Sequence, residues 1–340
     1  MAAFTQRLAA NVPGDFFVDS TCIDCGTCRQ IAPASFAEGS DWSFVHHQPA
    51  GETEMHRACM ALVACPVAAI GAVSKHAFGA ARAAFPDPIE DGVHYCGYAA
   101  ESSYGARSYL IVRPRGNILV DSPRYATPIV ERIDALGGVR WMFLTHRDDV
   151  ADHKRFHSRF RCDRILHRAD FEPDTRAVEI PLDGDAPVAF DDEVLLIPVP
   201  GHTPGSTCLL YRGRFLFSGD HAWWDPRRER IHASKRVCWY NWRKQTESMA
   251  RLAALRFDWL LPGHGTRCRL PAEQMRKEVE RCVARMRISP PSNIPATPCF
   301  TAFSTNGCNS RAGTGHSSQP GPMSSTTRRR SPNRTCSTSR

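Results

Sequence analysis

The sequence predicts a two-domain protein, in which a small cysteine-rich domain precedes a larger α/β domain of two sheets flanked by helices. Three observations lead to this prediction. Three closely spaced cysteines stand near the N-terminus, at Cys22, Cys25 and Cys28. Beyond residue 92, short apolar runs alternate with helical segments at wide spacing, as in domains built from sheets and helices. Four of these runs are followed at once by histidine or aspartate, which indicates one shared site.

Composition limits the partners of the chain. The formal net charge is +8, but the tail from Ser289 to Arg340 holds six arginines and no acidic residue. The rest of the chain is therefore near neutral, which argues against nucleic acid. No apolar run reaches the ~18 residues of a membrane helix, and Met1 to Ser20 lack the apolar core of a secretory signal. We expect a cytoplasmic protein without a membrane partner.

The cysteine spacing predicts an iron–sulfur cluster. Cys22, Cys25 and Cys28 form a C-x2-C-x2-C run, and Cys65 followed by Pro66 comes later. Three cysteines in a tight loop plus a distant Cys-Pro can each give one thiolate to a [4Fe–4S] cluster. The alternatives are a structural zinc knuckle or a disulfide framework.

Residues 15–73 resemble a single-cluster bacterial-type ferredoxin. Two-cluster relatives have a cysteine before the proline that stands here at Pro33, and this position is Ala32. The resemblance therefore implies one cluster, held by Cys22, Cys25, Cys28 and Cys65. Cys59 has no evident partner and is expected to be a buried free thiol.

The chain divides into four segments: a ferredoxin-like domain over 1–75, a Pro-containing linker over 76–91, the larger domain over 92–288, and a basic Ser/Thr/Pro-rich tail over 289–340. Half of the tail residues are Ser, Thr or Pro, so the tail is predicted to be disordered; a frameshifted end is the alternative. The apolar pattern predicts strands near 93–98, 109–112, 118–120, 141–144, 164–167, 194–198, 207–211 and 214–217. Helices are predicted near 57–63, 128–136, 152–160, 246–255 and 271–286.

Metal-binding residues concentrate after the strand at Trp141–Leu144. His146 to His153 contains two histidines and three aspartates. Imidazole and carboxylate suit a divalent ion such as zinc, manganese or iron. Three later strands end in Pro-Gly-His202, Gly-Asp220 and Pro-Gly-His264, and glycine lets the chain turn sharply so that the next side chain enters a shared cavity.

These motifs resemble the metallo-β-lactamase superfamily over roughly Gly92 to Ile288. The resemblance implies a four-layer αββα fold, with Asp121 supporting the site from behind. It also implies a set of metal ligands: His146, Asp152, His153, His202, Asp220 and His264. Asp220 would bridge two ions, a metal-bound hydroxide would be the nucleophile, and Asp152 would also act in catalysis.

The first motif departs from the family pattern. Where His-x-His-x-Asp-His is usual, this chain has His146-Arg-Asp148-Asp149-Val-Ala-Asp152-His153. An aspartate replaces the second histidine, and two extra residues precede the Asp-His pair. Asp148 keeps the i, i+2 spacing along an extended chain, so it is predicted as a ligand, with Asp149 as the alternative. An oxygen-rich site shifts the metal preference away from pure zinc and leaves one or two metals open.

The resemblance implies a metal-dependent hydrolase that attacks an ester, thioester, amide or phosphoester of a small-molecule substrate. Zinc is the expected ion, with iron and manganese as alternatives, and the cluster would serve electron transfer or regulation. One alternative is a redox enzyme. In it, the cluster receives electrons from a redox partner protein and delivers them to an iron centre. Another is a non-catalytic electron carrier or sensor. Trp223-Trp224 and Trp239 to Trp242 form either a substrate wall or part of the core.

Overall fold

Two β-sheets make up most of the larger domain. The computed structural model describes residues 2–288. The strands of this domain are β5 (Asp87–Glu90), β6 (Val93–Tyr95), β7 (Tyr109–Ile111), β8 (Ile118–Val120), β9 (Trp141–Phe143), β10 (Asp163–His167), β11 (Ile180–Leu182), β12 (Val188–Ala189), β13 (Val194–Pro198), β14 (Thr207–Tyr211), β15 (Phe215–Gly219), β16 (Trp223–Asp225), β17 (Arg230–His232), β18 (Trp259–Pro262) and β19 (Cys268–Arg269). The helices are α3 (Gly79–Ala83), α4 (Thr127–Ala135), α5 (His153–Phe160), α6 (Trp242–Leu252) and α7 (Ala272–Ile288).

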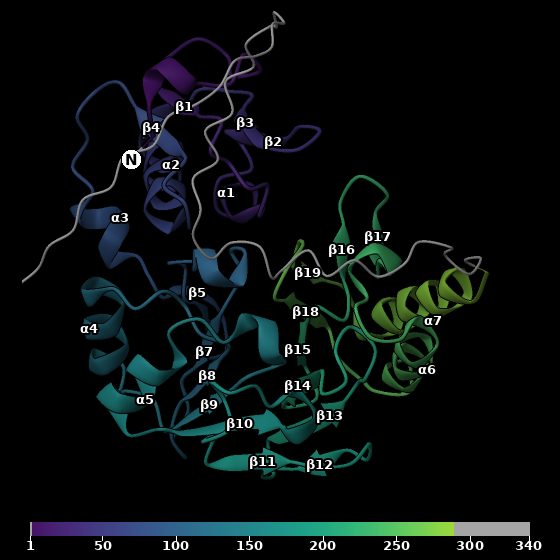
Figure 1. Cartoon of the computed structure of the whole chain (residues 1–340). Coiled ribbons are helices and arrows are strands. Elements are labelled where there is room, and N and C mark those ends of the chain that lie inside the picture. Colours follow the sequence, from purple (N-terminus) through teal and green to yellow (C-terminus); the bar gives the residue numbers. More distant parts are fainter. Residues whose placement is uncertain (1, 289–340) are drawn as a thin grey trace, which may run out of the picture. The chain divides into compact units, whose positions relative to one another are not determined.

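A seven-stranded sheet has the order β11-β10-β9-β8-β7-β6-β5, and a six-stranded sheet the order β12-β13-β14-β15-β18-β19. β16 and β17 form a separate two-stranded antiparallel sheet. Figure 1 shows α4 and α5 beside the first sheet and α6 and α7 beside the second.

Alternating side chains of the six-stranded sheet divide between two cores. Leu196 and Leu209 lie in the core that also contains the seven-stranded sheet. Their sequence neighbours Ile197 and Leu210 lie in a second core with α6 and α7. Because successive side chains of a strand point to opposite faces, one face packs on the other sheet and the opposite face on the helices.

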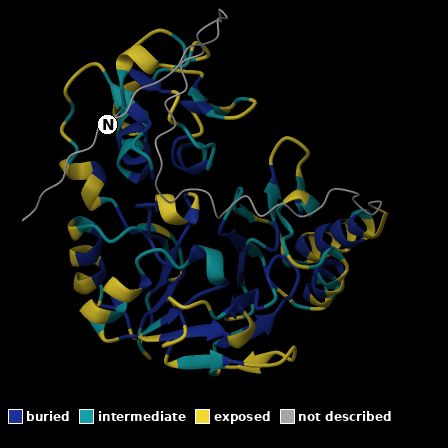
Figure 2. Cartoon of the chain, in the orientation of Figure 1, coloured by how far each residue is buried: buried dark blue, intermediate teal, exposed yellow. Residues whose placement is uncertain are grey.

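Helices cover the outer face of the seven-stranded sheet as well. Ile129 and Ile133 of α4 and Phe156 of α5 are buried in the core of that sheet. The i, i+4 spacing of the two isoleucines places both on one side of α4. The order of layers is therefore helix, sheet, sheet, helix, and the expected four-layer αββα fold is confirmed. Figure 2 shows the central strands of this domain as buried, whereas the edge strand β12 is exposed.

Strand direction brings the ends of the key strands together. In the first sheet β8, β9 and β10 run parallel. In the second, β13 and β15 are both antiparallel to β14, so they share a direction, and β18 is parallel to β15. Strands of a sheet that share a direction end at the same edge. The segments that follow β9, β13, β15 and β18 carry His146, His202, Asp220 and His264.

The two sheets meet at Thr145. Its carbonyl oxygen accepts a hydrogen bond from the Thr207 backbone N–H, at 2.8 Å. Gly219 lies against it with φ at +49°, and a Cβ added at Gly219 would come within 2.6 Å of Thr145 Oγ1. A residue without a side chain is needed at this crossing, because only glycine combines that backbone conformation with so close an approach.

The N-terminal residues form a small α+β domain. Its elements are η1 (Phe4–Gln6), β1 (Phe16–Val18), α1 (Thr27–Ile31), β2 (Phe36–Glu38), β3 (Ser43–Val45), α2 (Gly51–Ala64) and β4 (Ile70–Ala72). β1 pairs with β4, and β2 with β3, both antiparallel. The buried side of α2 is formed by Ala58, Ala61 and Ala64, whose small side chains allow close packing. This domain and the larger one lie within one compact unit.

Most expected elements are present, with three corrections. Helix α2 begins at Gly51, six residues before the predicted Arg57. The linker is shorter than predicted, because Asp87–Glu90 is the edge strand β5 of the seven-stranded sheet. The strand was not predicted because it contains Pro88, and proline usually argues against a strand. Proline is nevertheless tolerated on an edge strand, where one side of the backbone is unpaired. Helix α6 begins at Trp242, four residues before the predicted Thr246. The predicted disordered tail lies outside the described residues. Among the described helices, none is long and apolar enough to cross a membrane.

Candidate metal centre and cluster pocket

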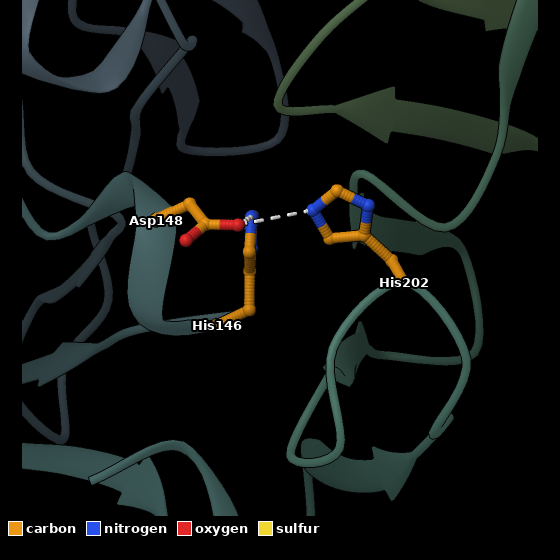
Figure 3. A group of neighbouring side chains, drawn as sticks. All are labelled: His146, Asp148 and His202. Carbon is orange, nitrogen blue, oxygen red and sulfur yellow. Dashed lines mark ion pairs between the residues drawn. The ribbon is translucent and has the colours of Figure 1, made fainter. Parts of the chain in front are cut away.

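Histidines and aspartates from both sheets converge at the shared edge. His146 Nε2 lies 3.9 Å from carboxylate oxygens of Asp148, Asp149 and Asp220. His202 Nε2 lies 3.3 Å from Asp148 Oδ2 and 3.7 Å from Asp220 Oδ2. Figure 3 shows His146 and Asp148, which come from one short segment, facing His202. Two groups offer atoms close enough to share an ion, one of His146, Asp148 and His202 and one of His146, Asp149 and Asp220.

Several of these polar atoms are buried without a hydrogen-bond partner. They are His146 Nε2, His202 Nε2, His264 Nε2 and Asp149 Oδ2. A buried polar atom left unpaired costs ~1–3 kcal/mol, so four in one place need an explanation. Imidazole nitrogen and carboxylate oxygen are the donors that a zinc, iron or manganese ion accepts. The residues present therefore fit a divalent metal.

A hydrogen-bonded chain orients His146. Asp121 accepts hydrogen bonds from the backbone N–H of Thr145, at 2.8 Å, and from its hydroxyl, at 3.0 and 3.1 Å. Because the hydroxyl donates to Asp121, it accepts from His146 Nδ1, 3.0 Å away. The lone pair of His146 then lies on Nε2, which faces the site. Burial and the neighbouring His202 lower the pKa of His146, which favours the neutral ligand form. Asp121 thus lies behind the site, as the resemblance implied.

His202 is oriented by a backbone carbonyl. Its Nδ1 donates to the carbonyl oxygen of Val237, so its Nε2 also presents a lone pair to the site. The same arrangement, in which the far nitrogen of a histidine is hydrogen-bonded, is usual for metal-binding imidazoles.

Asp170 is a positioning residue that the sequence reasoning missed. This fully buried carboxylate accepts hydrogen bonds from Gly205 N (2.7 Å), Thr203 Oγ1 (2.5 Å) and Arg147 N (3.1 Å). It therefore ties the turn that carries His202 to the segment that begins at His146. The one available signal was an aspartate shortly after a predicted strand, which by itself is too common to single out.

His264 and Asp220 form a close pair. His264 Nδ1 lies 2.8 and 2.9 Å from the two carboxylate oxygens of Asp220. Burial opposes ionisation of Asp220, but the charge of His264 and this hydrogen bond, together with His146 and His202, hold its pKa below the usual range. Asp220 is therefore an anion that faces three imidazoles.

Asp149 is the more deeply buried of the two neighbouring aspartates. It is 1% exposed, whereas the side chain of Asp148 is 39% exposed. Burial, and then the negative charge of Asp220, raise the pKa of Asp149 well above its usual value. Gly263 packs directly on Asp149 and Asp220, since a Cβ at Gly263 would come within 2.7 Å of Asp149 Oδ2 and 2.9 Å of Asp220 Oδ1. Both aspartates thus lie within reach of the candidate ion.

The structure does not bring Asp152 and His153 to the other predicted ligands. Asp152 Oδ2 accepts a hydrogen bond from Tyr125 N at 2.7 Å. His153 is buried between Asp174 and Arg164, at 3.2 and 3.1 Å. The two extra residues before the Asp-His pair place it past the strand end, at the start of α5. The prediction that Asp152 and His153 are metal ligands, and that Asp152 acts in catalysis, therefore does not fit their positions.

Two aromatic side chains flank the histidines. The ring of Trp239 lies 6.1 Å from that of His202, and the ring of Tyr104 lies 6.4 Å from that of His264. Trp224 and Trp242 instead pack against the core beneath α6 and α7. The aromatic segments therefore divide between the wall of the site and the core.

The four predicted cluster cysteines share one pocket in the N-terminal domain. Cys22, Cys25, Cys28 and Cys65 line it together with apolar residues that include Val18 and Ile70, and all four are free thiols.

The surroundings of these thiols combine backbone hydrogen-bond donors with burial. Backbone N–H groups of Ser43 and Ala69 donate to Cys22 Sγ and Cys65 Sγ, at 3.4 and 3.3 Å. Burial raises the pKa of the Cys28 thiol to about 12 and that of Cys65 to about 11. Without a cation these groups stay protonated, whereas bound iron would deprotonate them. The pocket therefore fits an iron–sulfur cluster. Cys59 is buried and free, as expected.

Comparisons with known proteins agree with the N-terminal assignment. Residues 18–72 match the family described as the 4Fe-4S single cluster domain of ferredoxin I. No curated protein matches the sequence significantly.

Solved structures similar to the chain include three whose identities are 14–16%. The metallo-β-lactamase FIM-1 from Pseudomonas aeruginosa, in its mono-zinc form, has a TM-score of 0.44 and 14% identity, covering 59% of this chain and 95% of its own. An archaeal metallo-β-lactamase superfamily protein from Sulfolobus tokodaii has a TM-score of 0.42 and 16% identity, covering 61% and 92%. ETHE1 from Myxococcus xanthus has a TM-score of 0.42 and 15% identity, covering 60% and 92%. The chain thus joins a single-cluster 4Fe-4S ferredoxin domain to a larger domain with a four-layer αββα fold.

Proposed function

We propose that the larger domain is a metal-dependent hydrolase of the metallo-β-lactamase superfamily acting on a small-molecule substrate. The observation that carries this proposal is the convergence of His146 and His202 with Asp148, Asp149 and Asp220, beside His264. The Nε2 atoms of all three histidines and Asp149 Oδ2 are buried without a hydrogen-bond partner. A divalent ion held there would supply an activated water and polarise the bond to be cleaved. An ester, thioester, amide or phosphoester bond suits that chemistry.

The ligand atoms bear on the number of ions. Both close groups contain His146, and its Nε2 has one lone pair to give. One ion would therefore use His146 and His202 with Asp148 or Asp220. A second ion would depend on the remaining donors, Asp149 and the Nε2 of His264. We propose that the ion is zinc. Iron and manganese are the alternatives, because the carboxylates make the site richer in oxygen than a purely histidine site.

The other residues of the site bind and orient. Asp121 and Asp170 keep the two histidine-bearing segments in place through the hydrogen bonds described above. Trp239 presents an aromatic ring beside His202 and would exclude water from that side of the substrate.

Hydrolysis is tested with zinc-loaded protein against a panel of esters, thioesters, amides and phosphodiesters. We expect zinc-dependent turnover of at least one class, and loss of that turnover in His202→Ala with the cluster absorbance unchanged. Turnover that survives in His202→Ala, or no turnover of any class by zinc-, iron- and manganese-loaded protein, would contradict the proposal.

A second candidate is an oxidoreductase in which electrons from the cluster reach iron at the same centre. The specific observation in its favour is the ferredoxin domain itself, since hydrolysis neither consumes nor releases electrons. Metal analysis after anaerobic purification, combined with the hydrolysis assay, separates the two. Zinc at the centre favours hydrolysis, and iron beyond that of the cluster in a protein without turnover favours redox chemistry.

A further inference from the structure

The loop before β7 packs directly on a cluster cysteine. Gly105 has φ at +79°, and a Cβ added there would lie 2.5 Å from Cys25 Cβ and 2.9 Å from Cys25 Sγ. Thr27 lies beside this contact: its Oγ1 is 3.4 Å from Cys25 Sγ, and its hydroxyl donates to the Gly105 carbonyl oxygen, also at 3.4 Å. Thr27 is 1% exposed. The main chain of the larger domain therefore forms one side of the surroundings of Cys25.

Two residues further on, the same loop contacts the turn that carries His264. Arg107 is 2% exposed. Its backbone N–H and its guanidinium both donate to the carbonyl oxygen of Gly263, at 2.8 and 3.3 Å. Its other guanidinium nitrogen lies 3.5 Å from the position that a Cβ of Gly26 would take, in the cysteine loop. Arg107 thus lies between the cysteine loop and the residue next to a candidate metal ligand.

Tyr104 completes the connection. Its ring centroid is 6.4 Å from that of His264, and it is bonded directly to Gly105, which touches Cys25. Burial, and then the charges of Asp24, Cys25 and Cys22, raise the pKa of Tyr104, consistent with its position near the cluster cysteines. His264 in turn is hydrogen-bonded to Asp220.

We infer that the segment from Tyr104 to Arg107 is an electron path from the cluster to the metal centre, entering at Cys25 and leaving through Tyr104 to His264. The donor to the cluster is a low-potential one-electron carrier protein, and the acceptor is a ferric ion held by the His/Asp centre. One electron moves: the reduced cluster returns to its oxidised state as the ferric ion becomes ferrous, and no bond is formed or broken. The path rests on the second candidate function, electron transfer from the cluster to iron at the centre, and it does not depend on hydrolysis.

Rapid-freeze paramagnetic resonance tests the path without an assay of turnover. Protein with an intact cluster and ferric iron at the centre is mixed anaerobically with less than one equivalent of dithionite. The signal of the reduced cluster should decay as the ferric signal of the centre disappears. In zinc-loaded protein, which offers no acceptor, the cluster signal should persist.

The variants place the path at Tyr104. Tyr104→Ala should slow the decay several-fold, because the ring that bridges to His264 is lost, whereas Tyr104→Phe should retain it. Tyr240→Ala is the matched control, since Tyr240 is a tyrosine of similar exposure (46% against 45%) that follows Trp239 on the His202 side. It should leave the rate unchanged. Each variant must keep its iron content and cluster absorbance.

Two results would overturn the inference: a cluster signal that persists in iron-loaded wild type, or equal decay rates in wild type and Tyr104→Ala. Zinc-dependent hydrolysis with no electron transfer would leave the proposed hydrolase standing and show that the cluster does not communicate with the centre. Electron transfer without hydrolysis would do the reverse.

Discussion

At the scale of single residues, the two extra residues between His146 and the Asp152-His153 pair decide which carboxylates face the candidate ion. His146 follows β9 closely, and the end of a strand positions a side chain reproducibly. The irregular turn after it brings Asp148 and Asp149 to within 3.9 Å of His146 Nε2. It leaves Asp152 and His153 at the start of α5, which corrects the predicted ligand set.

Asp149→Asn and Asp152→Asn form an isosteric pair that tests this correction. Asp149→Asn replaces a carboxyl group that faces the candidate ion with a neutral amide, which cannot become an anionic ligand, so metal affinity should fall by more than the ~10–100-fold typical of residues that only orient a ligand. The metal-free protein should be no less stable, because a buried carboxylate beside Asp220 is costly. Asp152→Asn keeps an oxygen to accept from Tyr125 N and should bind metal normally. Anaerobic metal titration of both proteins distinguishes them, and equal affinities would show that Asp149 is no ligand.

Asp170→Asn tests the positioning role. An amide can replace one carboxylate oxygen but not both, so at least one of the donors Arg147 N, Thr203 Oγ1 and Gly205 N loses its acceptor. We expect a loss of ~1–3 kcal/mol in the free energy of unfolding and weaker metal binding by ~10–100-fold. Urea denaturation measures the first and metal titration the second. Unchanged metal affinity would limit Asp170 to a role in stability.

At the scale of elements, the strand ends were predictable and the small accessory strands were not. β13 and β14 were predicted residue for residue, because each is an apolar run bounded by turn-forming residues. β16 and β17 were not predicted, because three-residue strands rich in tryptophan, arginine and histidine are too short to show an alternation of apolar and polar residues. Which turns come together follows from strand direction within the sheets, a tertiary property that a single sequence does not contain.

Gly263→Ala tests the turn after β18. The added methyl group would meet carboxylate oxygens of Asp149 and Asp220 at less than 3 Å, so both must shift away from the centre. We expect reduced metal affinity with normal cluster content and a fold that is preserved by circular dichroism. Gly79→Ala is the control, because nothing lies within 4 Å of its added Cβ. Equal affinities in the two variants would show that the turn tolerates the methyl group.

At the scale of the whole molecule, the cysteine pocket and the candidate metal centre are built from separate parts of the chain. Sequence predicted the four cysteines that share a pocket and the three histidines, His146, His202 and His264, at the candidate metal centre. It could not show that the loop from Tyr104 to Arg107 contacts both Cys25 and Gly263, because residues from three distant segments meet there.

Cys65→Ser should remove or degrade the cluster, since a serine oxygen is a poor substitute for a thiolate on iron. The metal centre should keep its affinity, because its ligands all lie beyond residue 145. Absorbance of the cluster and titration of the centre with zinc, made on the same preparation, check both parts. Simultaneous loss of both centres would mean that the cluster is needed to form the metal site.

Two separate centres are tested most directly by iron, sulfide and zinc analysis of anaerobically purified wild-type, Cys65→Ser and His202→Ala protein. We predict four irons and four sulfides per chain, as in one 4Fe-4S cluster, with further metal at a second centre. Of the two variants, only Cys65→Ser should lose the sulfide and the iron of the cluster. Only His202→Ala should lose the further metal. Sulfide-free protein, two clusters per chain, or His202→Ala protein with its full metal content would contradict this prediction.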